Sequence, residues 1–252
     1  MTKPSGSPKA VVVHLHGFSD HCNRYGSLFP ALAAAGILVH GFDQRGWGRS
    51  VKKPSDRGNT KGTKQVMNDI TEIIRTHLPS PAPLFLMGHS MGGAETLYYA
   101  ATGPADIRNQ IRGFVVEAPW VALHPASQPS SITVMVGKLA SMLVPNHQMV
   151  SKLDPQYQCH NDAICKDWEM DPLCHDTGTL ETMAGCLGRA DELRNGNLSF
   201  DGNCRIWLGH GNGDMVTSYE ASKQLMERVS LKDKTFKTYN GCYHCSTFLG
   251  SL

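Results

Sequence analysis

The stretch "PLFLMGHSMGG", residues 83–93, decides the fold. Its first part is a short apolar run without polar alternation, which is typical of a strand buried on both faces of a parallel sheet. Glycines on both sides of Ser90 allow a tight turn, and "MGGAETLYYAATG" after it predicts a helix. Because G-x-S-x-G lies here between a strand and a helix, we predict that Ser90 is a nucleophile held at the end of a buried strand.

The composition sets broad limits on the class of protein. With 252 residues and 40% hydrophobic content, the chain can form one sizeable core and one inserted subdomain. A formal charge of +2 without long like-charge blocks predicts no nucleic-acid partner. We expect a soluble, cytoplasmic protein, because we find neither a run of about 18 apolar residues nor an apolar N-terminal signal segment.

Five further apolar runs resemble the strand at 83–90, and helix-period segments such as 64–78 lie between them. The five runs are 10–17, 37–43, 113–119, 205–211 and 235–241. Strands that alternate with helices predict an α/β fold with a mostly parallel sheet flanked by helices. In such sheets ligands bind at the carboxyl ends of the strands, where Ser90 lies.

The alternation stops between residues 121 and 203, a region too long for a connecting loop. We therefore predict a core of residues 1–120 and 204–252, with 121–203 inserted as a helical cap, or lid, after the strand at 113–119. Two apolar stripes at helical spacing lie in this cap. The first stripe is Ile132, Met135, Val136, Leu139, Met142 and Leu143, and the second is Leu180, Met183, Ala184 and Leu187. The stripes either pack on the core, or form an apolar lid in which the first stripe also binds substrate.

A nucleophilic serine needs a base to accept its proton and an acid to orient that base. In this type of fold the partners follow in the order Ser, Asp/Glu, His. The loop "LGHGNGDMVTS" after one strand contributes Asp214, and "TYNGCYHCS" after the last strand contributes His244. Glu117, at the end of another strand, remains an alternative acid.

The negative charge that develops on the attacked carbonyl needs amide donors. We predict that one is the backbone amide of Met91, directly after the nucleophile, and the other that of Phe18 in "HLHGFSDH". This chemistry requires no metal and no organic cofactor.

Together these residues make the sequence resemble the monoacylglycerol lipases, in the α/β-hydrolase group that also contains serine aminopeptidases. The resemblance covers about residues 9–248 and rests on "HLHGFSDHCNRY", "DQRGWGRS", "GHSMGG", "HGNGDMVTS" and "GCYH", in that order. It implies the α/β-hydrolase fold, with the cap after that fold's sixth strand, and the triad and amide donors named above. It also implies that Asp20 and Arg24 line the polar end of the substrate pocket, although a loop ion pair is an equal alternative. We include His89, beside the nucleophile, among the substrate-binding residues.

The ends of the chain differ from that group. Only about ten residues precede the first strand and eight follow His244. We therefore expect the N-terminal strands and the C-terminal helix of the family to be missing, with reduced stability or association through the exposed sheet face as a consequence.

The eight cysteines are expected to be free thiols rather than a disulfide framework. Cys242 and Cys245 flank His244, so alkylation of either is expected to disturb the base. The cap contains further cysteines near two histidines, but their spacing is not that of a zinc site. This second group is Cys159, Cys165, Cys174, Cys186, His160 and His175.

The sequence therefore predicts a serine hydrolase that cleaves long-chain carboxylic esters, in first place a monoacylglycerol, through an acyl-enzyme on Ser90. Its partner is a small lipid ester, and the cap is expected to touch a membrane or lipid-droplet surface. The same triad would also suit an aminopeptidase, a thioesterase or a small-ester esterase. An aminopeptidase would bind the substrate amine through cap carboxylates such as Asp167, Glu169 and Asp171. A ligand-binding protein with an inactive site is the alternative from another class.

Overall fold

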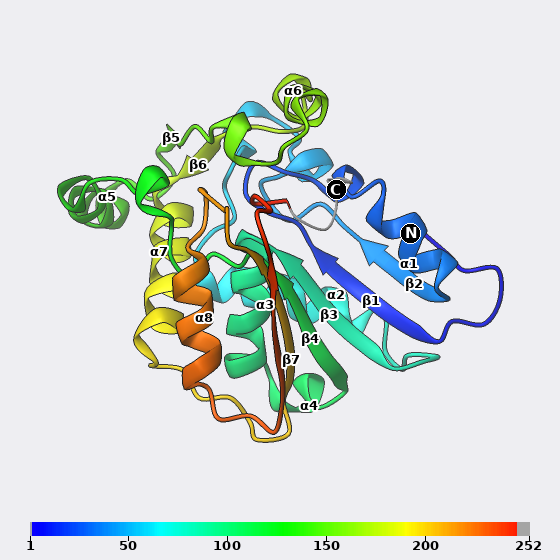
Figure 1. Cartoon of the computed structure of the whole chain (residues 1–252). Helices are drawn as coiled ribbons and strands as arrows, with labels where there is room; N and C mark the ends of the chain where they lie inside the picture. Colours follow the sequence, from blue (N-terminus) through cyan, green and yellow to red (C-terminus); the bar gives the residue numbers. More distant parts are fainter. Residues whose placement is uncertain (1, 246–252) are drawn as a thin grey trace.

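The structure is a computed structural model that describes residues 2–245. Residues 246–252 lie outside the described part. The expected absence of a C-terminal helix refers to these residues and stays a prediction. Six parallel strands form one sheet in the order β2-β1-β3-β4-β7-β8 (Figure 1). The strands are β1 (Ala10–Leu15), β2 (Ile37–Gly41), β3 (Leu84–His89), β4 (Ile111–Glu117), β7 (Arg205–Gly211) and β8 (Asp233–Tyr239). All six predicted strands are therefore confirmed.

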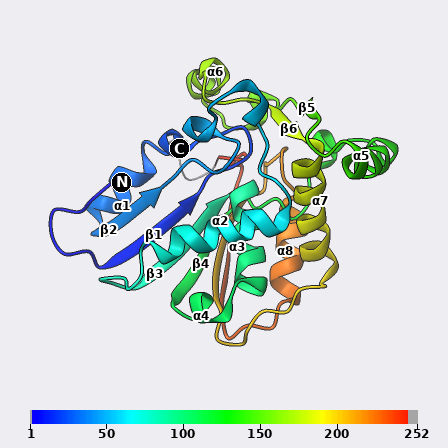
Figure 2. The same ribbon diagram turned by 180° about the vertical axis from the view of Figure 1, so that it is seen from behind.

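Helices cover the two faces of this sheet (Figures 1 and 2). The core helices are α1 (Leu28–Ala34), α2 (Thr63–Arg75), α3 (Met91–Thr102), α4 (Ala105–Arg108) and α8 (Tyr219–Arg228). Single 3-10 turns lie in the core at η1 (Cys22–Arg24), η2 (Gly48–Ser50) and η3 (Pro54–Asp56), and in the segment between β4 and β7 at η4 (Pro125–Ser127) and η5 (Pro155–Tyr157).

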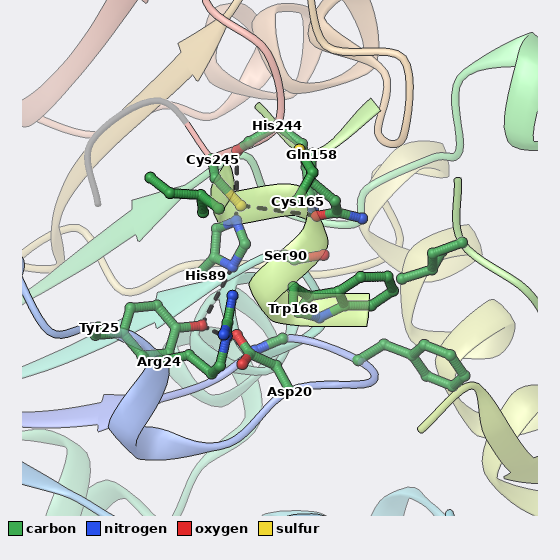
Figure 3. Close-up of a pocket in the computed structure, with 14 residues that line it drawn as sticks. Asp20, Arg24, Tyr25, His89, Ser90, Gln158, Cys165, Trp168, His244 and Cys245 are labelled. Atoms are coloured by element: carbon green, nitrogen blue, oxygen red, sulfur yellow. Dashed lines mark hydrogen bonds between the residues drawn. The ribbon is translucent and has the colours of Figure 1, made fainter. Parts of the chain in front are cut away.

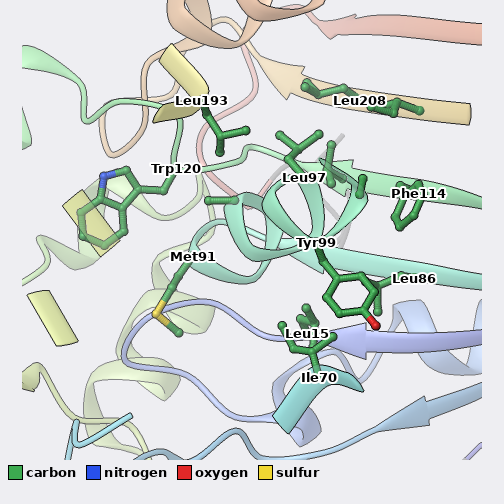
Figure 4. Close-up of a cluster of buried hydrophobic side chains, with 14 of the residues drawn as sticks. Leu15, Ile70, Leu86, Met91, Leu97, Tyr99, Phe114, Trp120, Leu193 and Leu208 are labelled. Carbon is green, nitrogen blue, oxygen red and sulfur yellow. The ribbon is translucent and has the colours of Figure 1, made fainter. Parts of the chain in front are cut away.

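Alternation along β1 shows how the strands serve both faces. Val11 and Val13 belong to the main core with α2 and α3, whereas Val12 joins a smaller cluster with α1. In the main core, the strand residues Leu86 and Leu208 belong to the same buried cluster as Leu97 of α3 (Figure 4). Because this interior is close-packed, the end of β3 and the start of α3 have little freedom to move.

The segment predicted as a cap lies between β4 and β7. It forms α5 (Ser131–Leu143), β5 (Gln148–Val150), α6 (Asp162–Met170), β6 (Thr177–Thr179) and α7 (Leu180–Asn195). Strands β5 and β6 form an antiparallel pair. Figure 1 places α5, α6 and this pair above the carboxyl ends of the sheet strands, while α7 descends beside α3. That this segment is a separate domain stays a prediction.

Candidate active site

Ser90 occupies a sharp turn between β3 and α3. Its backbone has φ 55° and ψ −116°, a sparsely populated conformation for a residue with a side chain and one often found at functional sites. A Cβ on Gly88 would overlap the carbonyl oxygen of Gly92, so glycine permits this approach. The Ser90 amide donates to the Glu117 carbonyl at 3.0 Å, and the Ser90 carbonyl accepts from the Trp120 amide at 3.0 Å. These bonds to the end of β4 hold the strained turn in place.

His244 and Asp214 form the predicted acid–base pair. Nδ1 of His244 donates to Oδ2 of Asp214 at 2.8 Å, and both residues are buried. The other carboxylate oxygen accepts from the amides of Val216 at 2.7 Å and Thr217 at 2.9 Å. Burial raises the pKa of Asp214, but the neighbouring His244 and the hydrogen bond from His210 outweigh it and lower that pKa below its usual value. Asp214 is therefore a carboxylate that can orient His244, with the Nε2 atom of His244 free to act as base.

The turn and His244 meet in one cavity. Ser90 and His244 both line it, although they come from the ends of β3 and β8, and the His89 ring lies 4.8 Å from that of His244 (Figure 3). Among residues 2–245, the Ser90 hydroxyl has no hydrogen-bonding partner, which suits a nucleophile whose contact with its base tightens once substrate is bound. Asp214 is the carboxylate bonded to His244, so the alternative acid Glu117 is not needed.

The two predicted amide donors flank the serine. A Cβ on Gly17 would lie 3.2 Å from the Ser90 Cβ, which shows how closely the loop carrying Phe18 approaches the turn. His16 holds this loop, because its Nε2 accepts from the Gln44 amide at 2.9 Å and its carbonyl accepts from the Gln44 side chain at 2.9 Å. Met91 opens α3, so its amide is among those without an intrahelical acceptor. Their role as an oxyanion hole stays a proposal.

The cavity around Ser90 and His244 is small, about 40 Å³, and partly polar. It contains the three predicted polar residues Asp20, Arg24 and His89, closed over by Trp168 of α6 (Figure 3). The indole Nε1 of Trp168 donates to the Ser19 carbonyl at 3.2 Å. Burial raises the pKa of Asp20 to about 6, even though the His21 amide bonds its carboxylate. The Asp20 carboxyl therefore changes its charge in the weakly acidic range.

Arg24 has the predicted place in the small cavity, but its ion pair is with the cap and not within its own loop. It lines the small cavity, and its Nη1 lies 2.6 Å from Oδ2 of the exposed Asp167 in the cap. Asp171 of the cap bonds His21 at 2.9 Å. Two of the three cap carboxylates considered for binding an amine are thus already paired with groups of the core.

A second, larger cavity begins at Ser90 and extends beneath the cap helices. It has a volume of about 810 Å³ and an apolar lining that includes Phe18 and Trp120. The whole second stripe lines it: Leu180, Met183, Ala184 and Leu187. From the first stripe, Ile132 and Val136 line it as well.

The rest of the first stripe faces elsewhere. Met135 and Leu139 line a neighbouring groove between α5 and α7, which does not include Ser90. Met142 and Leu143 line neither space and are 78% and 84% exposed, so their placement does not support the expected role in substrate binding. All six stripe residues are at least 55% exposed, which excludes packing on the core. Helical periodicity groups side chains on one face, but cannot say what that face meets.

The cap also holds the loop that carries the base. The Cys245 amide donates to the Gln158 carbonyl at 2.7 Å. Nε2 of His160 lies 2.8 Å from the Gly241 carbonyl, and its ring packs against Tyr243 with centroids 3.7 Å apart. Sequence reasoning missed these contacts and Trp168, because they depend on how the cap folds back rather than on local spacing.

Metal-ligating residues gather at one place in the described part of the chain. The ligand atoms of His21, Asp171 and Cys174 lie within 4.8 Å of one another. Arg24 Nη1 is 3.9 Å from the Asp171 oxygen that His21 also contacts, so a guanidinium already supplies positive charge there. All eight cysteines are free thiols, including Cys159 and Cys165 with sulfur atoms 3.5 Å apart.

Comparisons with known proteins agree with this geometry. A Schizosaccharomyces pombe protein is 34% identical over 244 residues, which cover 96% of this chain and 64% of that protein. A Dictyostelium discoideum protein is 31% identical, and this chain spans 25% of its length. The mouse monoglyceride lipase is 29% identical over 96% of this chain and 77% of its own.

Two solved structures share the fold. The monoacylglycerol lipase of Paleococcus ferrophilus superposes with a TM-score of 0.82 and 30% identity, covering 95% of this chain and 88% of its own. A monoglyceride lipase from Saccharomyces cerevisiae gives a TM-score of 0.89 over 99% of this chain and 83% of its own, at 23% identity. The predicted α/β-hydrolase fold is confirmed. Residues 6–248 match the family model described as serine aminopeptidase, S33, and with the serine turn at the end of β3 and the Asp–His pair beside it, this chain belongs to that family of α/β-hydrolases.

Proposed function

We propose that the protein is a serine hydrolase that cleaves a monoacylglycerol to a fatty acid and glycerol. One observation carries this proposal: Ser90 lies where a cavity of about 810 Å³ with an apolar lining meets a partly polar one of about 40 Å³. The first suits a long acyl chain, since moving the chain out of water is favourable by about 0.8 kcal/mol per buried methylene. The second suits a small hydroxylated alcohol. The relatives named as monoglyceride lipases support the same substrate.

The proposed reaction follows from the positions of the three side chains. The Ser90 oxygen attacks the ester carbonyl while Nε2 of His244 accepts its proton, and Asp214 stabilises the imidazolium. The amides of Phe18 and Met91 stabilise the oxyanion. His244 then returns the proton to the leaving glycerol oxygen. Water, activated by the same histidine, hydrolyses the acyl-enzyme and releases the fatty acid.

We also propose that α5 rests on a lipid surface, from which the acyl chain enters the larger cavity. The helix exposes six large apolar side chains, and its sequence "SITVMVGKLASML" contains no acidic residue. In water such a contiguous apolar face is unfavourable, and it is typical of a membrane-contacting surface. No helix in the described part of the chain is long and apolar enough to cross a bilayer.

A substrate panel tests the reaction. Wild type and Ser90→Ala are compared on monoacylglycerols of increasing chain length, a short-chain thioester and an aminoacyl amide. We expect turnover of the long-chain monoacylglycerols by the wild type alone. Faster turnover of the amide or the thioester would replace the proposed substrate with one of the alternatives, and failure of a fluorophosphonate to label Ser90 would contradict hydrolase activity altogether.

Vesicle flotation tests the surface. We expect Leu139→Glu with Leu143→Glu to reduce binding to phosphatidylcholine vesicles, because two charges then face the acyl region. Gln224→Glu adds a charge on exposed α8 and serves as the matched control. Equal binding of all variants would remove α5 as the contact.

A further inference from the structure

A second histidine contacts the catalytic carboxylate. Nε2 of His210, at the end of β7, lies 3.0 Å from Oδ2 of Asp214. This is the same oxygen that accepts from Nδ1 of His244 at 2.8 Å. His210 is fully buried, and neither its ring nor its backbone lines the two cavities at Ser90. The reaction as proposed uses one imidazole, so the second needs another explanation.

The surroundings of His210 fix which of its nitrogens carries the proton. Within the described residues, Nδ1 of His210 is buried without a hydrogen-bonding partner. If Nδ1 held the hydrogen, that donor would be unsatisfied, and the Nε2 lone pair would face a carboxylate oxygen at 3.0 Å. Both arrangements are costly in a buried site. The neutral ring therefore donates from Nε2 to Asp214, and the edge contact of its ring with Tyr219, 5.9 Å between centroids, helps to hold its plane.

Thr217 cannot fully replace this donor. Its hydroxyl lies 2.9 Å from Oδ2 of Asp214, but also 3.1 Å from the Ala118 carbonyl. A hydroxyl has one hydrogen, and these two acceptors compete for it. His210 Nε2 also has the Thr217 hydroxyl at 3.3 Å, but the carboxylate oxygen of Asp214 is closer, at 3.0 Å, and carries the charge, so it is the stronger acceptor.

We propose that His210 is a positioning residue that holds Asp214 Oδ2 against His244 and shares the negative charge of that oxygen between two imidazoles. The proposal rests on the proposed triad of Ser90, Asp214 and His244. Two effects follow when the donor is removed. The carboxylate becomes less well oriented, which slows the reaction of Ser90. Its charge also acts more fully on His244, which then takes up a proton at higher pH.

Other titratable groups around the pair remain the same in each variant. They come from the loop after β1, from β3, β4, α8 and β8, and from the loop of the base: Asp20, His89, Glu117, Tyr219, Tyr239, Cys242 and Cys245. Burial lowers the pKa of His89 well below its usual value and raises the pKa of Cys245 well above its own. Both shifts favour the neutral form of the side chain near neutral pH. A change in the acid limb between variants can thus be assigned to the contact at residue 210.

The experiment compares His210→Leu with His210→Gln. The amide nitrogen of glutamine can reach the position of Nε2, whereas leucine has no donor. We measure the rate of fluorophosphonate labelling of Ser90 against pH, and the pH midpoint of the His244 ring signals by NMR. For His210→Leu we expect labelling about ten-fold slower and an acid limb about half a unit higher. His210→Gln should restore most of both, and KM for a monoacylglycerol should change in neither.

The matched control is His14→Leu, because His14 is equally buried but lies on β1, away from Asp214. It should leave the acid limb where it is. Circular dichroism and thermal melting show whether each variant folds. Where His210→Leu does not fold, His210→Asn replaces it, because the shorter amide of asparagine does not reach the carboxylate of Asp214.

Three results would overturn the role of His210: an acid limb in His210→Leu equal to that of the wild type, a glutamine variant no better than leucine, or equal NMR midpoints for His244 in all variants. Failure of the substrate proposal gives a different pattern, because wild type would then label but not cleave monoacylglycerols. If the wild type does not label with the fluorophosphonate, the hydrolase proposal itself fails.

Discussion

A buried ion pair connects the cap to the helix that follows the nucleophile. Nη2 of Arg189 on α7 lies 3.2 Å from Oε1 of Glu95 on α3, and their side chains are 3% and 1% exposed. Arg189 also donates to the hydroxyl of Thr63 at 3.0 Å. Replacement of one partner leaves the other charge buried and alone, which typically costs about 3–5 kcal/mol. We therefore expect Arg189→Met to destabilise the protein by an amount in this range near neutral pH.

The cost should depend on pH in a defined direction. Burial raises the pKa of Glu95 from 4.5 to about 7, although Arg189 lowers it. Because the folded protein holds this proton more tightly than the unfolded chain, the contribution of Glu95 to stability is present below about pH 4.5 and is lost as the pH rises through about 7. Without Arg189 the pKa of Glu95 rises further. The penalty of Arg189→Met should therefore be about 1–2 kcal/mol larger at pH 8.5 than at pH 5.5.

Urea unfolding at pH 5.5, 7 and 8.5 measures this penalty for Arg189→Met, Glu95→Gln and the double variant. The double variant should be more stable than Arg189→Met at pH 8.5, since no charge is left buried. Arg45→Met, which breaks an exposed pair with Asp69, is the control and should cost under about 1 kcal/mol at every pH. A penalty of Arg189→Met that does not change with pH, or a double variant that shows the full sum of the single losses, would refute the reasoning.

Three further predictions concern the reaction. Asp214→Asn should lower kcat by about 10³–10⁴-fold, because the amide no longer fixes the tautomer of His244; an ester hydrolysis assay with near wild-type turnover would contradict the assignment. Because burial raises the pKa of Asp20 to about 6, its carboxylate forms above that pH and can accept hydrogen bonds from glycerol, so KM for a monoacylglycerol should fall between pH 5 and 7. The Asp20→Asn variant should show a flat KM, and parallel profiles of the two proteins would argue against the contact. Burial raises the pKa of the Cys245 thiol well above its usual value, so inactivation by N-ethylmaleimide should be slow at pH 7, faster at pH 9 and absent in Cys245→Ala; loss of activity in that variant at the wild-type rate would place the sensitive thiol elsewhere.

Local patterns were sufficient for the sheet and for the placement of the proposed triad residues. The strands, the turn at Ser90, and the positions of Asp214 and His244 follow from short apolar runs and from loops that must end at the same edge of a parallel sheet. The direction of the α5 stripe did not follow, because a period of 3.6 residues defines a face without defining its neighbour. Trp168 gave no signal in the sequence, since its place beside Ser90 in the small cavity depends on contacts between segments about 150 residues apart. His210 and Asp214 are only four residues apart in the sequence. Their contact becomes informative in the structure, where both are buried and His210 and His244 meet the same oxygen of Asp214.

The contacts of Gln158 and His160 with the loop of residues 241–245 join the cap to the segment that carries His244. The cap hydrogen-bonds the Cys245 amide and the Gly241 carbonyl, which lie on either side of His244 in the chain. We expect a compound that binds beside Tyr243 and breaks these contacts to displace His244 without contacting Ser90. Under the proposed reaction, such a compound would inhibit turnover without occupying either cavity at Ser90.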